Sequence, residues 1–82
     1  ADSPLRSSAY WALGKRRDPR DVTPLVAALR RELPRDADVA YQILIALENL
    51  GEPVFPPEQR ERSSRDHEAN RAAAQRYLHN RP

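Results

Sequence analysis

The sequence contains no cysteine, no methionine and only two glycines among its 82 residues. Without cysteine the chain can form neither a disulfide nor a thiolate metal site, so packing alone must hold a domain small enough for its core to be marginal. Two glycines are too few for a phosphate-binding glycine loop. No apolar run reaches the length of a membrane span, and no signal-peptide pattern is present. We therefore expect no cofactor and no membrane partner.

What the chain does contain suits a water-soluble helical domain. Apolar residues make up 39% and charged residues 32% of the sequence, with both signs well mixed. The formal net charge is only +2. Nucleic-acid binding would need that charge to gather on one face.

The spacing of apolar residues, together with helix start and stop signals, predicts four helices. They span about residues 4–16, 22–33, 37–50 and 66–79, and a proline-rich loop, residues 53–65, holds at most a short helix near residues 57–62. Ser3, Asp36 and Asp66 can cap the first, third and fourth helices, and Gly51 stands where a left-handed residue ends a helix.

One face of each helix is expected to form the core. The predicted core residues are Leu5, Ala9, Ala12 and Leu13 in the first helix, Leu25, Val26, Leu29 and Leu33 in the second, Val39, Ala40, Ile43, Leu44, Ala46, Leu47 and Leu50 in the third, and Ala69, Ala72, Ala73 and Tyr77 in the fourth. The third helix is the most apolar of the four, so we expect neighbours on most of its sides.

An internal repeat links these helices. The segment "DSPLRSSAYWALGKRRDP", residues 2–19, aligns without a gap with "DADVAYQILIALENLGEP", residues 36–53, at an offset of 34 residues. A third and weaker copy, "DHEANRAAAQRYL" at residues 66–78, follows at an offset of 30. Repeats of this length are typical of stacked helix pairs.

The repeated segments resemble the HEAT repeat, in the short bacterial form called the phycobilisome-lyase-type HEAT-like repeat. The stretches "WALGKRRDPRDVTPLVAAL" and "ALENLGEP" carry the resemblance, and "EANRAAAQRYL" matches more loosely. Arg16 and Arg17 depart from the pattern, because the family usually has an apolar residue and a glycine there. The resemblance implies an all-α fold over residues 1–82: an α-solenoid of about four main helices, with residues 4–16, 37–50 and 66–79 as inner helices, residues 22–33 as an outer helix and a degenerate terminal repeat.

The resemblance also bears on where the chain comes from. It has no initiating methionine and begins directly on an inner helix. We therefore favour a fragment of a longer chain, in the cytoplasm, over a processed exported chain, which stays as the alternative.

Candidate catalytic residues are sparse. His67 and His79 lie twelve residues apart on one predicted helix, which is not a metal-ligand spacing. Most aspartates stand at caps and turns, and Glu48 and Glu52 fit a solvated helix face. We therefore expect no enzyme, including the bilin lyases that name the repeat class.

A binding surface is the stronger candidate. The side of the third helix opposite its core carries Asp38, Tyr41, Gln42, Ile45, Glu48 and Asn49. The 34-residue offset places Pro4, Ser7, Ser8, Trp11, Gly14 and Lys15, in that order, at the matching outward positions of the first helix. In HEAT-like solenoids the inner helices line the concave, partner-binding face. The predicted partner-binding residues are Trp11, Ile45, Tyr41, Lys15, Gln42 and Gln75. Alternatively, a preceding repeat or the chain's own terminus covers Trp11.

Two functions follow. The first is a non-catalytic protein-interaction or scaffold module, because outward-pointing apolar and aromatic side chains are typical of interface hot spots. The alternative is a module that binds the nucleic-acid backbone, as HEAT-like arrays do in alkylpurine DNA glycosylases. The basic run Lys15, Arg16, Arg17 and Arg20 is interrupted by Asp18 and Asp21, so a solvated turn is favoured over a phosphate site.

Overall fold

The computed structural model describes residues 3–81, with the side chain of Ser3 left out. It contains four α-helices: α1, Ser3–Arg16; α2, Val22–Glu32; α3, Ala37–Asn49; and α4, His67–His79. A short 3₁₀ helix, Pro19–Asp21, leads into α2. The all-α prediction is confirmed, and the helix ends lie within one residue of the predicted ones. Residues 50–66 contain no helix, so the short helix allowed near residues 57–62 does not form.

The helix ends follow the predicted capping chemistry. Asp36 accepts hydrogen bonds from the backbone N–H groups of Asp38 and Val39, at 3.1 and 3.2 Å, and Asp66 accepts one from Ala69 at 3.4 Å. Gly51 has a φ of 90°, as expected for a left-handed residue after a helix. The predicted cap at Ser3 falls on a side chain outside the described set.

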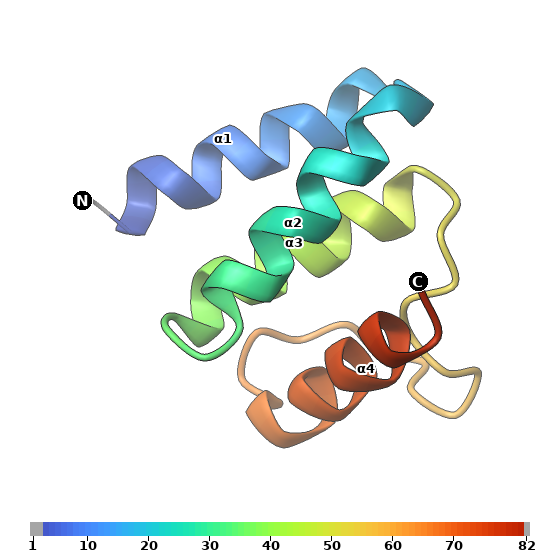
Figure 1. The fold of residues 1–82 in the computed structure, drawn as a ribbon. Coiled ribbons are helices and arrows are strands. Elements are labelled where there is room, and N and C mark those ends of the chain that lie inside the picture. Colours follow the sequence, from blue (N-terminus) through green and yellow to red (C-terminus); the bar gives the residue numbers. More distant parts are fainter. Residues whose placement is uncertain (1–2, 82) are drawn as a thin grey trace.

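The helices α1, α3 and α4 run in the same direction, and α2 runs in the opposite direction, in front of α3 in this view (Figure 1). The main packing partner of α1 is α3; α2 also packs on α3, and α4 packs against both α2 and α3. The body is compact, with a radius of gyration of 11.4 Å and extents of 29 × 25 × 24 Å. Among the described residues, none of the helices is long and apolar enough to cross a membrane.

The centre of the core is α3, as its composition predicts. Val39, Ala40, Ile43, Leu44, Ala46 and Leu47 are all buried, and Leu50 is partly buried. Leu25, Val26 and Leu29 of α2 complete this side of the core, with Leu33 partly buried. Both of these predicted faces are confirmed.

The predicted core face of α1 is wrong. Leu5 is 69% exposed and Ala9 and Ala12 are exposed. Of the four predicted residues only Leu13 packs against the core, partly buried; Gly14, which was expected to point outward, is buried, and Tyr10 is partly buried. The reason is steric: a Cβ atom at Gly14 would lie only 2.7 Å from the Cα of Ala46, so the absence of a side chain there lets α1 approach α3.

The side of α4 that faces the core also differs from the predicted side. Ala73 and Tyr77 are buried as expected, but Ala69 is only partly buried and Ala72 is exposed. Asn70 and Ala74 are buried in their place. Asn70 is accommodated because its amide donates to the Ser63 carbonyl at 2.8 Å and accepts from Gln59 Nε2 at 2.9 Å.

A buried carboxylate ties α1 to the turn between α2 and α3. Glu32 is 1% exposed, and its Oε2 receives a hydrogen bond from Arg6 Nε at 3.0 Å. The same guanidinium reaches Asp36 Oδ2 at 3.3 Å. Burial of a charge costs free energy unless the charge is paired. The ion pair with Arg6 therefore offsets the cost of burying the Glu32 carboxylate.

Candidate binding face

Trp11 lies on α1 with 51% of its surface exposed. Together with Ser7, Ser8 and Gln42 it lines an open depression of about 200 Å³ where α1 meets α3. Sites for small molecules are usually larger, about 300 to 1,000 Å³. This depression therefore fits a side chain of a partner better than a free small molecule.

Lys15 is placed next to this depression. It follows Trp11 by one helical turn, and its Nζ atom lies 5.2 Å from the centroid of the indole ring. Such a cation–π contact contributes about 0.5 to 1 kcal/mol at an exposed site. The contact keeps a positive charge at the edge of an otherwise uncharged depression.

The side of α3 that borders the depression carries three predicted residues. Gln42 lines it directly, and Ile45 follows one turn later, partly exposed. Tyr41 lies one turn before Ile45 and is also partly exposed. Burial raises the pKa of Tyr41, and the charge of Glu48 adds to the effect. The hydroxyl therefore keeps its proton to a higher pH than that of an ordinary tyrosine.

An ion pair that the sequence did not indicate joins α3 to the loop before α4. Arg62, in the loop before α4, donates from Nε and Nη2 to Glu48 Oε2, at 2.9 and 2.7 Å. Its guanidinium also stacks over Phe55, 4.3 Å from the ring centroid. Arg62 thus ties the loop to α3. No periodic signal marks a residue in an irregular loop, so sequence reasoning had no means of pairing it with Glu48.

The candidate residues are therefore only partly brought together. Trp11, Gln42 and Lys15 meet at the depression, and Ile45 and Tyr41 extend the surface along α3. We call the seven residues Ser7, Ser8, Trp11, Lys15, Tyr41, Gln42 and Ile45 the Trp11 face. Gln75 is exposed on α4, but it is not one of the residues that line the depression.

The basic turn after α1 is largely paired. Arg16 lies 3.6 Å from Asp18 and 3.4 Å from Asp21, and Arg20 lies 2.9 Å from Asp18. Hydrogen bonds from the side chain and backbone of Arg20 lower the pKa of Asp18. These pairs support the interpretation of this segment as a solvated turn.

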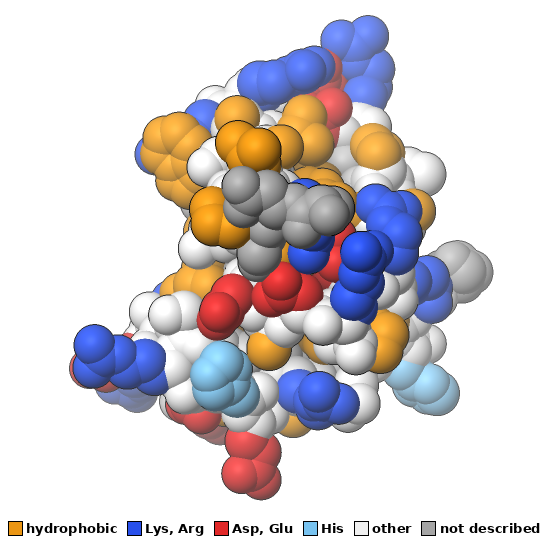
Figure 2. All heavy atoms as spheres, turned by 90° about the vertical axis from the view of Figure 1, so that its left-hand side faces the viewer, with side chains coloured by type: hydrophobic (Ala, Val, Ile, Leu, Met, Phe, Trp, Pro, Cys, Tyr) orange, Lys and Arg blue, Asp and Glu red, His pale blue; other side chains and the backbone are white. Residues whose placement is uncertain are grey.

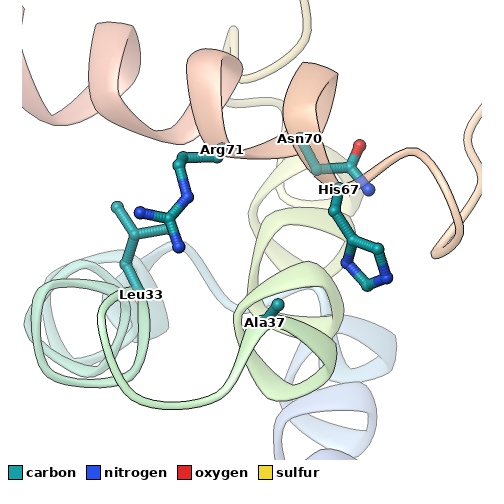
Figure 3. Close-up of a pocket in the computed structure, with 5 residues that line it drawn as sticks. All are labelled: Leu33, Ala37, His67, Asn70 and Arg71. Atoms are coloured by element: carbon teal, nitrogen blue, oxygen red, sulfur yellow. The ribbon is translucent and has the colours of Figure 1, made fainter.

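A second, smaller cavity lies where α4 meets the turn between α2 and α3. Figure 3 shows Arg71 extending from α4 toward Leu33, with His67 on the other side above Ala37. Its volume is about 80 Å³, which leaves room for only a few water molecules. The buried Asn70 that lines it already has partners in Gln59 and Ser63. We interpret this cavity as a packing gap between helices.

The Trp11 face supplies an indole, an amide, hydroxyl groups and an ammonium group, which together provide apolar contact and hydrogen bonding. His67 and His79 are both exposed on α4. Within residues 3–81, no group of three or more His, Cys, Asp or Glu side chains is placed to hold a metal ion. No family model, curated protein or solved structure matches the chain.

Proposed function

We propose that this chain is a non-catalytic protein-interaction or scaffold module built from HEAT-like repeats, and that it binds a partner protein through the Trp11 face. The observation that carries the proposal is the half-exposed Trp11 beside a depression between two packed helices. Tryptophan is among the commonest hot-spot residues of interfaces, and this is the single tryptophan of the chain.

The helix arrangement supports the HEAT-like part of the proposal. The two expected inner helices, α1 and α3, run in parallel and pack on each other, while the expected outer helix, α2, runs antiparallel to them (Figure 1). The turns after α1 and α3 also match: Arg17 and Gly51, 34 positions apart, both have positive φ angles, 53° and 90°. We assign α4 to a degenerate terminal unit.

The surface of the molecule supports a concave binding face. In the space-filling view the outline is hollowed along one edge, between the level of α1 and that of α4 (Figure 2). The size of the depression at Trp11 suits one or two side chains of a partner. Lys15 at its edge favours a partner segment that pairs an apolar side chain with a hydrogen-bond acceptor or a carboxylate.

Nucleic-acid binding stays as the alternative. It is less well supported, because several arginines already pair with carboxylates: Arg16 and Arg20 with Asp18, Arg62 with Glu48, and Arg81 with Glu52. A backbone-binding surface needs cations that are available to phosphates.

The test combines partner capture with the fluorescence of Trp11, the single tryptophan of the chain. The protein is immobilised, captured proteins are identified, and each one is purified and titrated against the free chain. A true partner should shift the Trp11 emission to shorter wavelength on binding, because the indole loses contact with water.

Two variants make the test specific. Trp11→Ala combined with Ile45→Ala has no tryptophan to report, so its binding is measured by capture on the immobilised variant; it should bind at least tenfold more weakly while circular dichroism shows unchanged helicity. The control, Arg30→Ala, changes an exposed residue of α2 that is not among the predicted binding residues, and it should bind as the wild type does. Loss of helicity in the double variant would show that the two residues belong to the core, and the Trp11 face would then be abandoned as a binding surface.

A titration with duplex DNA at 20 and 200 mM salt tests the alternative. Binding that is measurable at the lower salt and falls steeply at the higher one would favour the nucleic-acid function. No binding at either concentration would remove it.

A further inference from the structure

A groove lies between α4 and the loop that precedes it, and it shares no residue with the Trp11 face. Its volume is about 360 Å³, larger than that of the depression at Trp11. Pro56, Glu58 and Gln59 of the loop form one wall, and a stripe of residues from Asp66 to Arg76 forms the other. We call this site the α4 groove. Its volume suits a ligand of several groups better than a single side chain.

The path of the loop explains why there is a groove. Near the end of α4, Glu52 Oε1 accepts a hydrogen bond from the Tyr77 hydroxyl at 2.7 Å, and near its start, Gln59 Nε2 donates to Asn70 Oδ1 at 2.9 Å. The loop therefore runs antiparallel to α4 (Figure 1). Seven residues of helix rise only about 10 Å, whereas seven extended residues span about 23 Å. The loop is too long for a straight path between its two hydrogen bonds, so it bows and leaves space beside α4.

The middle of the groove is apolar. Ala69 is partly buried, Ala72 is exposed and Ala73 is buried. These positions are i, i+3 and i+4, so they lie on one side of the helix, and Pro56 lines the opposite wall. Alanine side chains are too short to fill the groove, so an apolar side chain of a ligand can pack over them.

The half of the groove at the start of α4 is acidic. Asp66 uses Oδ1 to cap the backbone N–H of Ala69, which leaves Oδ2 available. Glu58 stands on the opposite wall and forms no ion pair with any residue of the described range, 3–81. The exposed arginines of the loop, Arg60 and Arg65, are not among the residues that line the groove.

The other half of the groove is basic. Arg76 is exposed, about 15 Å further along the helix than Asp66. No carboxylate of residues 3–81 pairs with it. A hollow of about 200 Å³ that Arg76 also lines adjoins this end and adds the amide of Asn80. Arg81 lines the hollow too, but it already pairs with Glu52. Arg76 is therefore the cation that a ligand can use.

The two walls together define the ligand. An occupant gains most when it sets a cation against the acidic half and a carboxylate against Arg76. In an extended peptide, residues i and i+4 point to the same side about 13 Å apart, and residue i+2 points to that side between them. This spacing is close to the one along α4 and places the middle side chain over the alanines.

We propose that the α4 groove binds an extended segment of another protein in which a basic and an acidic residue stand four positions apart, with an apolar residue midway. The basic side chain pairs with Glu58 and Asp66, the apolar one covers Ala69 and Ala72, and the carboxylate pairs with Arg76.

The test uses the complete 82-residue chain and four short peptides with blocked ends. All have leucine at the centre; the residues two positions before and after it are Lys and Glu, Glu and Lys, Lys and Lys, or Glu and Glu. Binding is followed by backbone amide shifts in nuclear magnetic resonance spectra. At least one mixed peptide should shift the amides of Ala69, Ala72 and Arg76 and bind about fivefold more tightly than both like-charged peptides.

Charge-reversal variants then locate the contact. Arg76→Glu makes both halves of the groove acidic, so the Lys and Lys peptide should bind best. Glu58→Lys with Asp66→Asn makes both halves basic, so the Glu and Glu peptide should bind best, while asparagine still caps the helix. The matched control is Arg71→Glu, the same change at an exposed position of α4 outside the groove, and it should leave the order of the peptides unchanged. Loss of fold cannot produce such a change of preference.

Three results would overturn the proposal: no binding of any peptide, equal binding of all four, or shifts centred on Trp11 and Gln42 instead of α4. Sedimentation adds a fourth, a dimer of the free chain that Arg76→Glu dissociates, since a second copy would then occupy the groove. No substitution in this experiment lies in the Trp11 face, so the two surfaces are tested separately.

Discussion

Gly14 of α1 lies against Ala46 of α3 at the point where the two helices cross. A Cβ atom built at Gly14 would come within 2.7 Å of the Ala46 Cα and 2.9 Å of its Cβ. Both atoms belong to Ala46, a buried residue of α3, so neither can move aside as the end of a long side chain could. The absence of a side chain at Gly14 therefore sets the distance between α1 and α3, and with it the shape of the depression beside Trp11.

Gly14→Ala should destabilise the fold by about 1 to 3 kcal/mol, because α1 must move away from α3 to make room. Helix propensity alone predicts the opposite sign, a gain of about 0.5 to 1 kcal/mol. The free energy of unfolding from urea denaturation decides between them. Ala12→Gly, at an exposed position of the same helix, is the control and should lose only about 1 kcal/mol. A gain for Gly14→Ala would contradict the close crossing.

Arg17 and Gly51 should respond in opposite directions to substitution. Both occupy left-handed backbone, with φ of 53° and 90°, a conformation that costs an L-residue with a side chain roughly 1 to 2 kcal/mol. Arg17→Gly should therefore stabilise the protein by about 1 kcal/mol, and Gly51→Ala should destabilise it by a similar amount. Nothing lies within 4 Å of a Cβ atom at Gly51, so the loss there measures backbone strain alone. Thermal and urea unfolding report both changes.

Arg17→Ala serves as the control for this pair. It removes the same charge as Arg17→Gly but keeps a Cβ atom, so the backbone strain stays and no comparable gain is expected. Equal stabilisation by Ala and Gly would assign the effect to charge and not to backbone conformation.

Arg6→Ala should cost about 3 kcal/mol, because it leaves the buried carboxylate of Glu32 without its partner at 3.0 Å. Replacement of both residues, Arg6→Met with Glu32→Leu, should recover most of this loss, since two apolar side chains need no partner. A double-mutant cycle in urea measures the coupling. Arg20→Ala, which breaks an ion pair on the surface, is the matched control and should cost less than 1 kcal/mol. Additive effects at Arg6 and Glu32 would contradict the buried pair.

The sequence predicted α3 correctly because apolar residues cover most of its circumference, so that any rotation buries several of them. It did not predict the orientation of α1. Leu5, Ala9 and Ala12 form a more apolar stripe than the Tyr10, Leu13 and Gly14 side that packs. The outcome depends on how closely α1 can approach α3, and that distance is a property of both helices together.

The candidate site was predicted in part for a similar reason. The 34-residue offset gave the outward position of Trp11 correctly. The same offset predicted that Gly14 also points outward, but Gly14 is buried. Pairs such as Arg6 with Glu32, 26 residues apart, and Arg62 with Glu48, 14 residues apart, carry no sequence signal, since any of the chain's many charged residues could pair with any other.

Tyr77 should make the fold sensitive to alkaline pH. It is 4% exposed and donates its hydroxyl hydrogen to Glu52 Oε1 at 2.7 Å. Burial, followed by the hydrogen bond and the charge of Glu52, raises the pKa of Tyr77 well above its ordinary value. Because the folded-state pKa exceeds the unfolded one, this stabilisation is complete below about pH 10, the ordinary tyrosine value, and is lost as the pH rises through the folded-state value.

Tyr77→Phe should therefore lose about 1 to 3 kcal/mol at pH 7, where the hydrogen bond to a charged acceptor disappears, yet show a shallower fall in stability above pH 10 than the wild type. Urea unfolding at pH 7, 9, 10 and 11 measures both effects. Glu52→Gln separates the causes: it removes the charge but leaves Tyr77 buried, so part of the alkaline loss should persist. Identical slopes above pH 10 for the wild type and Tyr77→Phe would show that another group governs the alkaline limit of the fold.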